Sequence, residues 1–219
     1  MDMKHSVMSL VLLVGTLLLG GCEGKEPELP ETAVASIVTY ESTDNGTSVF
    51  TYTDGDGRLV TLTASWGGRD ELKPGARVLI YYRAEQYGVS GTVALLSVVP
   101  LPGGEPKRAD DADAVPSSEP LKECSAWLSG NYLNVSSVVT FAGDAAEVAL
   151  YVDATTADRQ IPSAYVVVRA KAEDAPMAAE RQLYASWNVA SILADPDNRG
   201  LDIYFTDSSN TQKVINITR

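Results

Sequence analysis

Histidine and cysteine are almost absent from this chain, which has one of the former and two of the latter among 219 residues. The histidine, His5, lies in an apolar N-terminal leader, so the chain that remains after processing has none. Without an imidazole there can be no Ser-His-Asp or Cys-His catalytic set and no histidine zinc site. Once Cys22 is modified, Cys124 is the one remaining thiol, which excludes an intramolecular disulfide and a CxxC redox site.

Basic residues are also scarce, with 17 Lys and Arg against 29 Asp and Glu and a net charge of −12. No segment gathers positive charge, whereas nucleic acids and anionic lipids bind basic surfaces. We therefore expect no nucleic-acid partner. The acidic surplus is typical of a surface that keeps a protein soluble.

A long apolar run is missing as well. Val7 to Leu19 spans about 13 residues, which suits a secretory signal and is shorter than the ~20 residues of a membrane span. Lys4 precedes this run, and Gly20-Gly21-Cys22 follows it. An apolar run, small residues and a cysteine together indicate a bacterial lipoprotein processing site. An ordinary signal peptide cleaved elsewhere, or a buried helix, is the alternative.

The sequence thus predicts a helical lipoprotein signal peptide over 1–21 and lipid attachment at Cys22. Residues 22–32 are polar and contain Pro27 and Pro30, which predicts an extended tether. The protein is expected in the cell envelope as an outer-membrane lipoprotein, facing either the periplasm or the surface.

Residues 33–100 alternate apolar stretches with turn signals and predict about five strands. Asp54-Gly55-Asp56-Gly57 is a strong hairpin signal between two of them. The order of a hairpin, a glycine-rich loop and two more strands resembles a small OB-type barrel, with a small sandwich as the alternative. The expected strands cover 33–40, 48–53, 58–64, 77–83 and 91–99.

Residues 101–120 combine prolines, glycines and charges with few bulky apolar residues, and predict an interdomain linker. Residues 121–219 hold strand candidates separated by turn clusters, which predicts an antiparallel β-sandwich. The expected fold class is therefore all-β after the leader. Expected strands here cover 132–141, 147–153, 164–172, 182–192, 201–206 and 213–218, with Trp127-Leu128 as a further edge.

This arrangement resembles the NigD-like lipoproteins of the Bacteroidetes over nearly the whole chain. Besides Cys22 and the barrel-like first half, the resemblance rests on Tyr132-Leu133-Asn134-Val135 and on the segments 184–189 and 200–205. It implies an OB-like N-terminal domain followed by a β-sandwich domain. It implies no established activity.

Several residues are candidates for sites. Asp54 and Asp56 look like half of a calcium loop, but a hairpin turn that needs positive φ at both Gly55 and Gly57 explains the segment without a metal. Cys124 is favoured as a small packed residue over a reactive thiol. Trp66 and Tyr87 lie in predicted loops and could stack on a sugar ring, although packing is the simpler interpretation.

We expect a non-enzymatic, lipid-anchored binding or assembly module without a cofactor. A glycan-binding surface lipoprotein is one alternative. A carboxylate-based hydrolase is the other and would need two carboxyl groups about 5–10 Å apart in a cleft. The expected partners are a membrane, through the lipid on Cys22, and an envelope protein or glycan; the ligand, the leaflet and the oligomeric state stay open.

Replacing Cys22 tests the anchor. Cys22→Ala removes the acyl acceptor and with it the buried methylene groups, each contributing about 0.8 kcal/mol to membrane binding. We expect soluble or unprocessed protein, measured by detergent-phase partitioning of the native material. Partitioning equal to that of the wild type would contradict lipid attachment at this residue.

Overall fold

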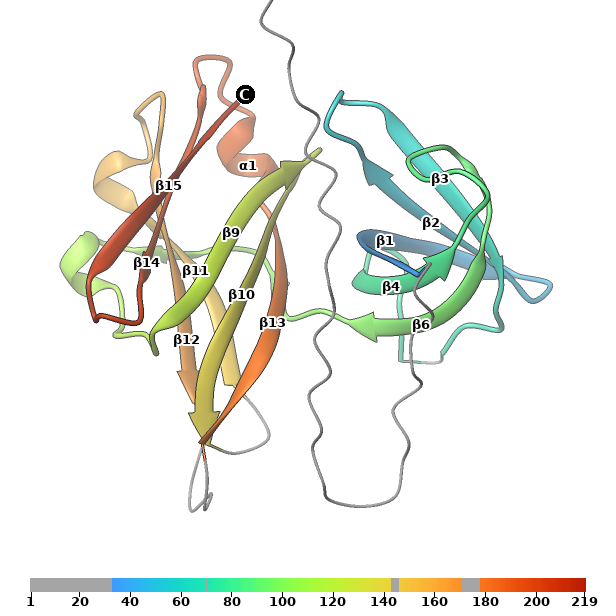
Figure 1. The fold of residues 1–219 in the computed structure, drawn as a ribbon. Coiled ribbons are helices and arrows are strands. Elements are labelled where there is room, and N and C mark those ends of the chain that lie inside the picture. The colour runs from blue at the N-terminus through green and yellow to red at the C-terminus, as the bar shows by residue number, and fades with distance from the viewer. Residues whose placement is uncertain (1–32, 70, 143–145, 171–177) are drawn as a thin grey trace, which may run out of the picture.

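The computed structural model describes residues 33–69, 71–142, 146–170 and 178–219. They form an N-terminal barrel and a C-terminal sandwich that lie side by side (Figure 1). None of the helices in these ranges has the length and apolar composition that a bilayer crossing requires. The expected signal peptide over 1–21, Cys22 and the tether over 22–32 lie outside the described residues.

The barrel is a single sheet in the order β5-β3-β2-β1-β4-β6. β5 pairs in parallel with β3, and β6 pairs antiparallel with β4. Only one residue separates β5 from β6, so this single stretch of chain pairs with both ends of the sheet and closes the barrel. Counting that stretch as one strand gives the expected five-stranded, OB-like barrel. The strands are β1 (Val34–Asp44), β2 (Thr47–Thr53), β3 (Leu59–Ser65), β4 (Arg77–Arg83), β5 (Gly91–Thr92) and β6 (Ala94–Pro100).

Alternation along the strands builds the barrel core, because successive side chains point to opposite faces. In β3, Val60, Leu62 and Ala64 are buried while the residues between them are more exposed. Phe50 and Tyr82 fill the same interior from other strands. Arg77 of β4 instead points out of the barrel and contacts the C-terminal unit.

The C-terminal unit packs two sheets face to face, in the orders β7-β13-β10-β9 and β15-β14-β12-β11-β8. The sandwich is confirmed, but both sheets are mixed: β7–β13, β8–β11 and β12–β14 are parallel pairs. The long strands are β9 (Leu121–Ser129), β10 (Tyr132–Ala142), β11 (Ala146–Asp153), β12 (Ser163–Ala170), β13 (Ala178–Asn188), β14 (Gly200–Thr206) and β15 (Gln212–Thr218).

The parallel pairs have a topological cause. β13 crosses to the other sheet between β12 and β14, so β14 returns beside β12 in the same direction. The other two pairs come from the segment 101–120, which contains β7 (Gly103–Gly104), β8 (Lys107–Ala109) and a short 3-10 helix over Ala112–Ala114. That segment connects the two units and runs along both sheets of the second.

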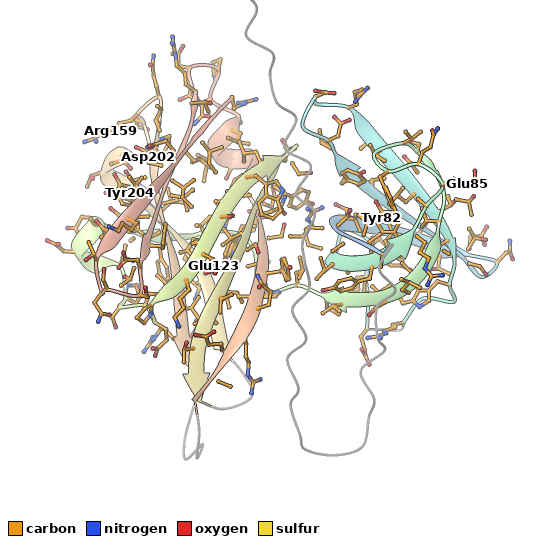
Figure 2. The ribbon with its side chains drawn as sticks, viewed as in Figure 1. Tyr82, Glu85, Glu123, Arg159, Asp202 and Tyr204 are labelled. Carbon is orange, nitrogen blue, oxygen red and sulfur yellow. The ribbon has the colours of Figure 1, made fainter. Side chains whose placement is uncertain are left out.

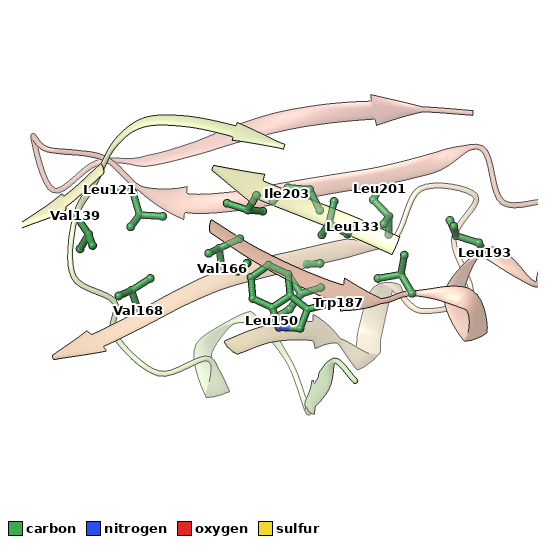
Figure 3. Close-up of a cluster of buried hydrophobic side chains, with 14 residues drawn as sticks. Leu121, Leu133, Val139, Leu150, Val166, Val168, Trp187, Leu193, Leu201 and Ile203 are labelled. Atoms are coloured by element: carbon green, nitrogen blue, oxygen red, sulfur yellow. The ribbon is translucent and has the colours of Figure 1, made fainter. Parts of the chain in front are cut away.

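The sandwich core lies between the inward faces of its two sheets. Trp187 of β13 is its largest fully buried side chain and packs among aliphatic residues that include Leu150 and Leu133 (Figure 3). Cys124 is half-buried at the margin of this core, and burial raises the pKa of its thiol to about 11. A thiol with so high a pKa is mostly protonated near neutral pH, which fits the packing role expected for it.

Two local predictions need correction. The expected strand over 182–192 ends at Asn188, because the Asn188 side-chain oxygen accepts a hydrogen bond from the backbone N–H of Ala190 and helix α1 (Ala190–Leu193) begins there. At the β2–β3 turn, the Asp54 carboxylate accepts the backbone N–H groups of Asp56 and Arg58. Only Gly57 of the two turn glycines has a positive φ, so Gly55 does not need one.

Trp187 and Trp127 offer a matched test of the core. Trp187→Ala should lower the free energy of unfolding by about 3–5 kcal/mol, because it leaves a large cavity. Trp127 is 36% exposed on β9, so Trp127→Ala should cost far less. Denaturant unfolding measures both, and equal losses would contradict the placement of Trp187 at the centre of the sandwich.

Candidate functional site at the junction of the two units

Polar side chains that should face solvent are buried where the two units meet. Asn134 lies between the core residues Leu133 and Val135 of β10, so it points away from the sandwich core, yet it is 0% exposed. Ser186 on the neighbouring strand β13 is 1% exposed in the same way. The outer face of β10 and β13 is thus covered by the barrel.

Arg77, the first residue of β4, joins the units through its guanidinium group. Its Nε donates to Ser186 Oγ at 2.9 Å, and Nη2 donates to Asn134 Oδ1 at 3.1 Å. Nη1 donates to Thr39 Oγ1 of the barrel at 2.8 Å. Ser186 Oγ in turn donates to Asn134 Oδ1 at 2.8 Å, so the network continues within the sandwich sheet.

Among the described residues, no carboxylate balances the charge of Arg77. All three hydrogen-bond acceptors are neutral, and no ion pair of this residue is present within the described ranges. The Tyr132 ring covers one face of the guanidinium, with Cζ 4.2 Å from the ring centroid. Burial lowers the pKa of Arg77 to about 10, so the group still carries its positive charge at neutral pH.

Contacts on either side of Arg77 extend the junction. Ser129 Oγ of β9 donates to the Thr53 carbonyl at 2.8 Å, across the two units. Tyr184 of β13 is partly buried near Tyr81 of β4, and burial, and then Tyr81, raise the pKa of Tyr184. The segment that connects the two units also pairs with β13 here, because the Ser186 N–H donates to the Pro102 carbonyl at 3.0 Å.

A pocket of about 560 Å³ opens beside this network. Arg77, Tyr132, Ser186 and Asn188 form its polar wall, and the Asn188 amide donates to the Glu105 carboxylate at 2.9 Å. The remaining lining residues are Glu71, Leu72, Gly75, Ala76, Pro100, Leu101, Gly103, Gly104 and Glu105. Pockets that bind small ligands have volumes in this range, with mostly apolar walls and a few placed polar groups.

Trp66 and Tyr87 lie elsewhere. Trp66 packs against Phe50 and Tyr40 at the margin of the barrel core, with ring centroids 6.0 and 6.2 Å away. Tyr87 is 48% exposed, and its ring lies beside that of Tyr82, with the centroids 6.3 Å apart. The structure therefore does not bring the two rings together, and Cys22 lies outside the described residues.

Another aromatic group crosses the outer face of the five-stranded sheet. Lys107, Tyr151, Tyr165, Tyr204 and Val214 are register partners on five adjacent strands and form one row, called here the tyrosine row. The Tyr165 and Tyr204 rings stack at 5.0 Å. Figure 2 shows Tyr204 on the side of the sandwich that faces away from the barrel.

Sequence reasoning missed the junction residues. Asn134 and Ser186 occupy outward-facing strand positions where polar residues are ordinary, and Arg77 reads as the polar first residue of a strand. Nothing local indicates that a second unit covers them. No group of three or more acidic, histidine or cysteine side chains suited to a metal occurs among the described residues.

The fold has counterparts among solved structures. A candidate toxin-related protein from Parabacteroides distasonis aligns with a TM-score of 0.63 at 15% identity, over 85% of this chain and 93% of that one. A candidate lipoprotein from Bacteroides fragilis gives 0.62 at 13%, over 85% and 97%. A NigD-like immunity protein from Bacteroides caccae gives 0.61 at 18%, over 83% and 91%.

These alignments cover most of both chains, so the pairing of barrel and sandwich is shared and the likeness to the NigD-like fold is confirmed. At this level of identity they concern the fold alone. No protein-family model matches the chain, and neither does any curated protein.

Gly103 gives a test of the junction. A Cβ at this residue would lie 1.6 Å from the Ser186 carbonyl oxygen, and its φ of +151° disfavours other residues. Gly103→Ala should detach β7 from β13, lower the free energy of unfolding by about 1–3 kcal/mol and speed exchange of the Ser186 amide proton. Gly91→Ala is the control, because an added Cβ meets nothing there; equal effects of both would contradict this packing.

Proposed function

We propose that this protein is a lipid-anchored, non-enzymatic binding module of the cell envelope, and that its ligand occupies the pocket between the two units. The observation that carries the proposal is the pocket itself, with a buried, positively charged Arg77 in its wall. The anchor is supported by the leader and Cys22, and by a fold shared with a candidate lipoprotein from Bacteroides fragilis.

The exposure and hydrogen bonding of the two carboxylates in the pocket wall favour binding over hydrolysis. Glu71 and Glu105 both line the pocket, so two carboxylates are available to a hydrolase hypothesis. Both side chains are exposed, and Glu105 is engaged by the Asn188 amide. A general acid is instead commonly placed in a water-poor, apolar environment.

A glycan-binding role is the second candidate, and the tyrosine row favours it. Three tyrosines and Lys107 lie side by side on one face, and Asp202 and Asn216 follow in the adjacent register row. Aromatic rings beside carboxylate and amide groups offer both stacking and hydrogen bonding to a sugar. This surface is separate from the junction pocket, so the two roles can be tested independently.

A cross-linked pull-down from the native envelope distinguishes these roles. Glu71→Trp adds bulk at an exposed position of the pocket wall, and Tyr204→Ala removes one ring of the tyrosine row. We expect Glu71→Trp to lose the partner that the wild type retains, while Tyr204→Ala keeps it. The reverse pattern would favour the glycan surface, and retention by both variants would contradict both candidates.

A further inference from the structure

We infer that the junction pocket binds a short peptide segment through its C-terminal carboxylate, which Arg77 receives, together with a basic group that Glu71 or Glu105 receives. This inference rests on the proposed binding function and names the ligand class of the same pocket. Three features of the described residues carry it: the unneutralised guanidinium, an unpaired buried amide beside it, and the carboxylates in the wall.

The guanidinium has donor capacity left. It has five N–H groups, and in the part of the chain that the structure describes three of them are used, by Ser186, Asn134 and Thr39. All three acceptors are neutral, although buried charges in proteins are normally paired. Arg77 is 9% exposed and lines the pocket, so an anion entering from there can reach it. A carboxylate would supply the missing negative charge.

The amide beside Arg77 also has an unused donor, although Asn134 is not itself a lining residue of the pocket. Asn134 is fully buried, and its Nδ2 has no hydrogen-bond partner among the residues that the structure describes. Its orientation is fixed, because Oδ1 accepts from both Arg77 and Ser186, and a flipped amide would set donor against donor. Buried donors without partners are rare and costly in folded proteins.

The carboxylates in the pocket wall determine which kind of anion can bind next to Arg77. The Glu105 carboxylate accepts a hydrogen bond from Asn188. Asn188 is the register partner of Tyr132, whose ring covers the Arg77 guanidinium. The carboxylate and the guanidinium therefore lie in the same part of the pocket without forming an ion pair. Glu71 adds a second negative charge to the lining. A dianion such as phosphate would be repelled by both carboxylates, whereas a zwitterion can satisfy both signs. A peptide end next to a lysine or arginine side chain has this pattern.

Two peptides that differ only at the C-terminus test the inference. Isothermal titration calorimetry of the processed chain with Gly-Gly-Lys as the free acid, and with its C-terminal amide, isolates the carboxylate. We expect the free acid to bind at least about tenfold more tightly, as a charge-assisted hydrogen bond implies. Arg77→Met should remove that preference, and Glu105→Gln should weaken both peptides while keeping it.

A control separates the pocket from the fold. Ser129→Ala removes the second contact between the units at Thr53, outside the pocket lining, and should keep the preference for the acid. Arg77→Lys keeps the positive charge and should therefore retain part of the preference for the acid. This result would show that Arg77→Met loses the preference through its charge. Acid and amide bound equally by the wild type, a preference that survives Arg77→Met, or no binding of either peptide at millimolar concentration would each overturn the inference. Because Glu71→Trp tests occupancy of the pocket with native partners, the proposed function can stand if this ligand class is wrong.

Discussion

The burial of one cation governs how the two units are arranged. A guanidinium group taken out of water without a carboxylate is costly unless its N–H groups are satisfied. Thr39 supplies an acceptor from the barrel, while Ser186 and Asn134 supply acceptors from the sandwich. Because neither unit alone provides all three acceptors, Arg77 makes these three hydrogen bonds only when the two units sit in one relative position.

The pocket is a consequence of that arrangement. β7 is held against β13 where the chain crosses from barrel to sandwich, and Gly103 of β7 allows the close approach of backbone to backbone. The wall on one side comes from residues before β4, and on the other from β10 and β13. A binding site built this way depends on both units, although its one buried positive charge, Arg77, comes from the barrel alone.

The sequence predicts the layout well because local signals determine it. The Asp54–Gly57 turn and the alternating β3 residues indicate the barrel, and the turn clusters after residue 121 indicate the sandwich. The parallel pairs and the junction could not be predicted, since they follow from which strands cross between sheets and from which face the other unit covers. The candidate residues Trp66 and Tyr87 lie in loops, whereas the aromatic rings that align lie on strands, at Tyr151, Tyr165 and Tyr204.

The most direct test of this account asks whether Arg77 holds the two units in one orientation. Residual dipolar couplings of backbone amides, measured in the wild type and in Arg77→Met, report the alignment of each unit separately. We expect one alignment tensor for both units in the wild type and two different tensors in the variant. Separate tensors in the wild type, or a single unchanged tensor in Arg77→Met, would contradict this account.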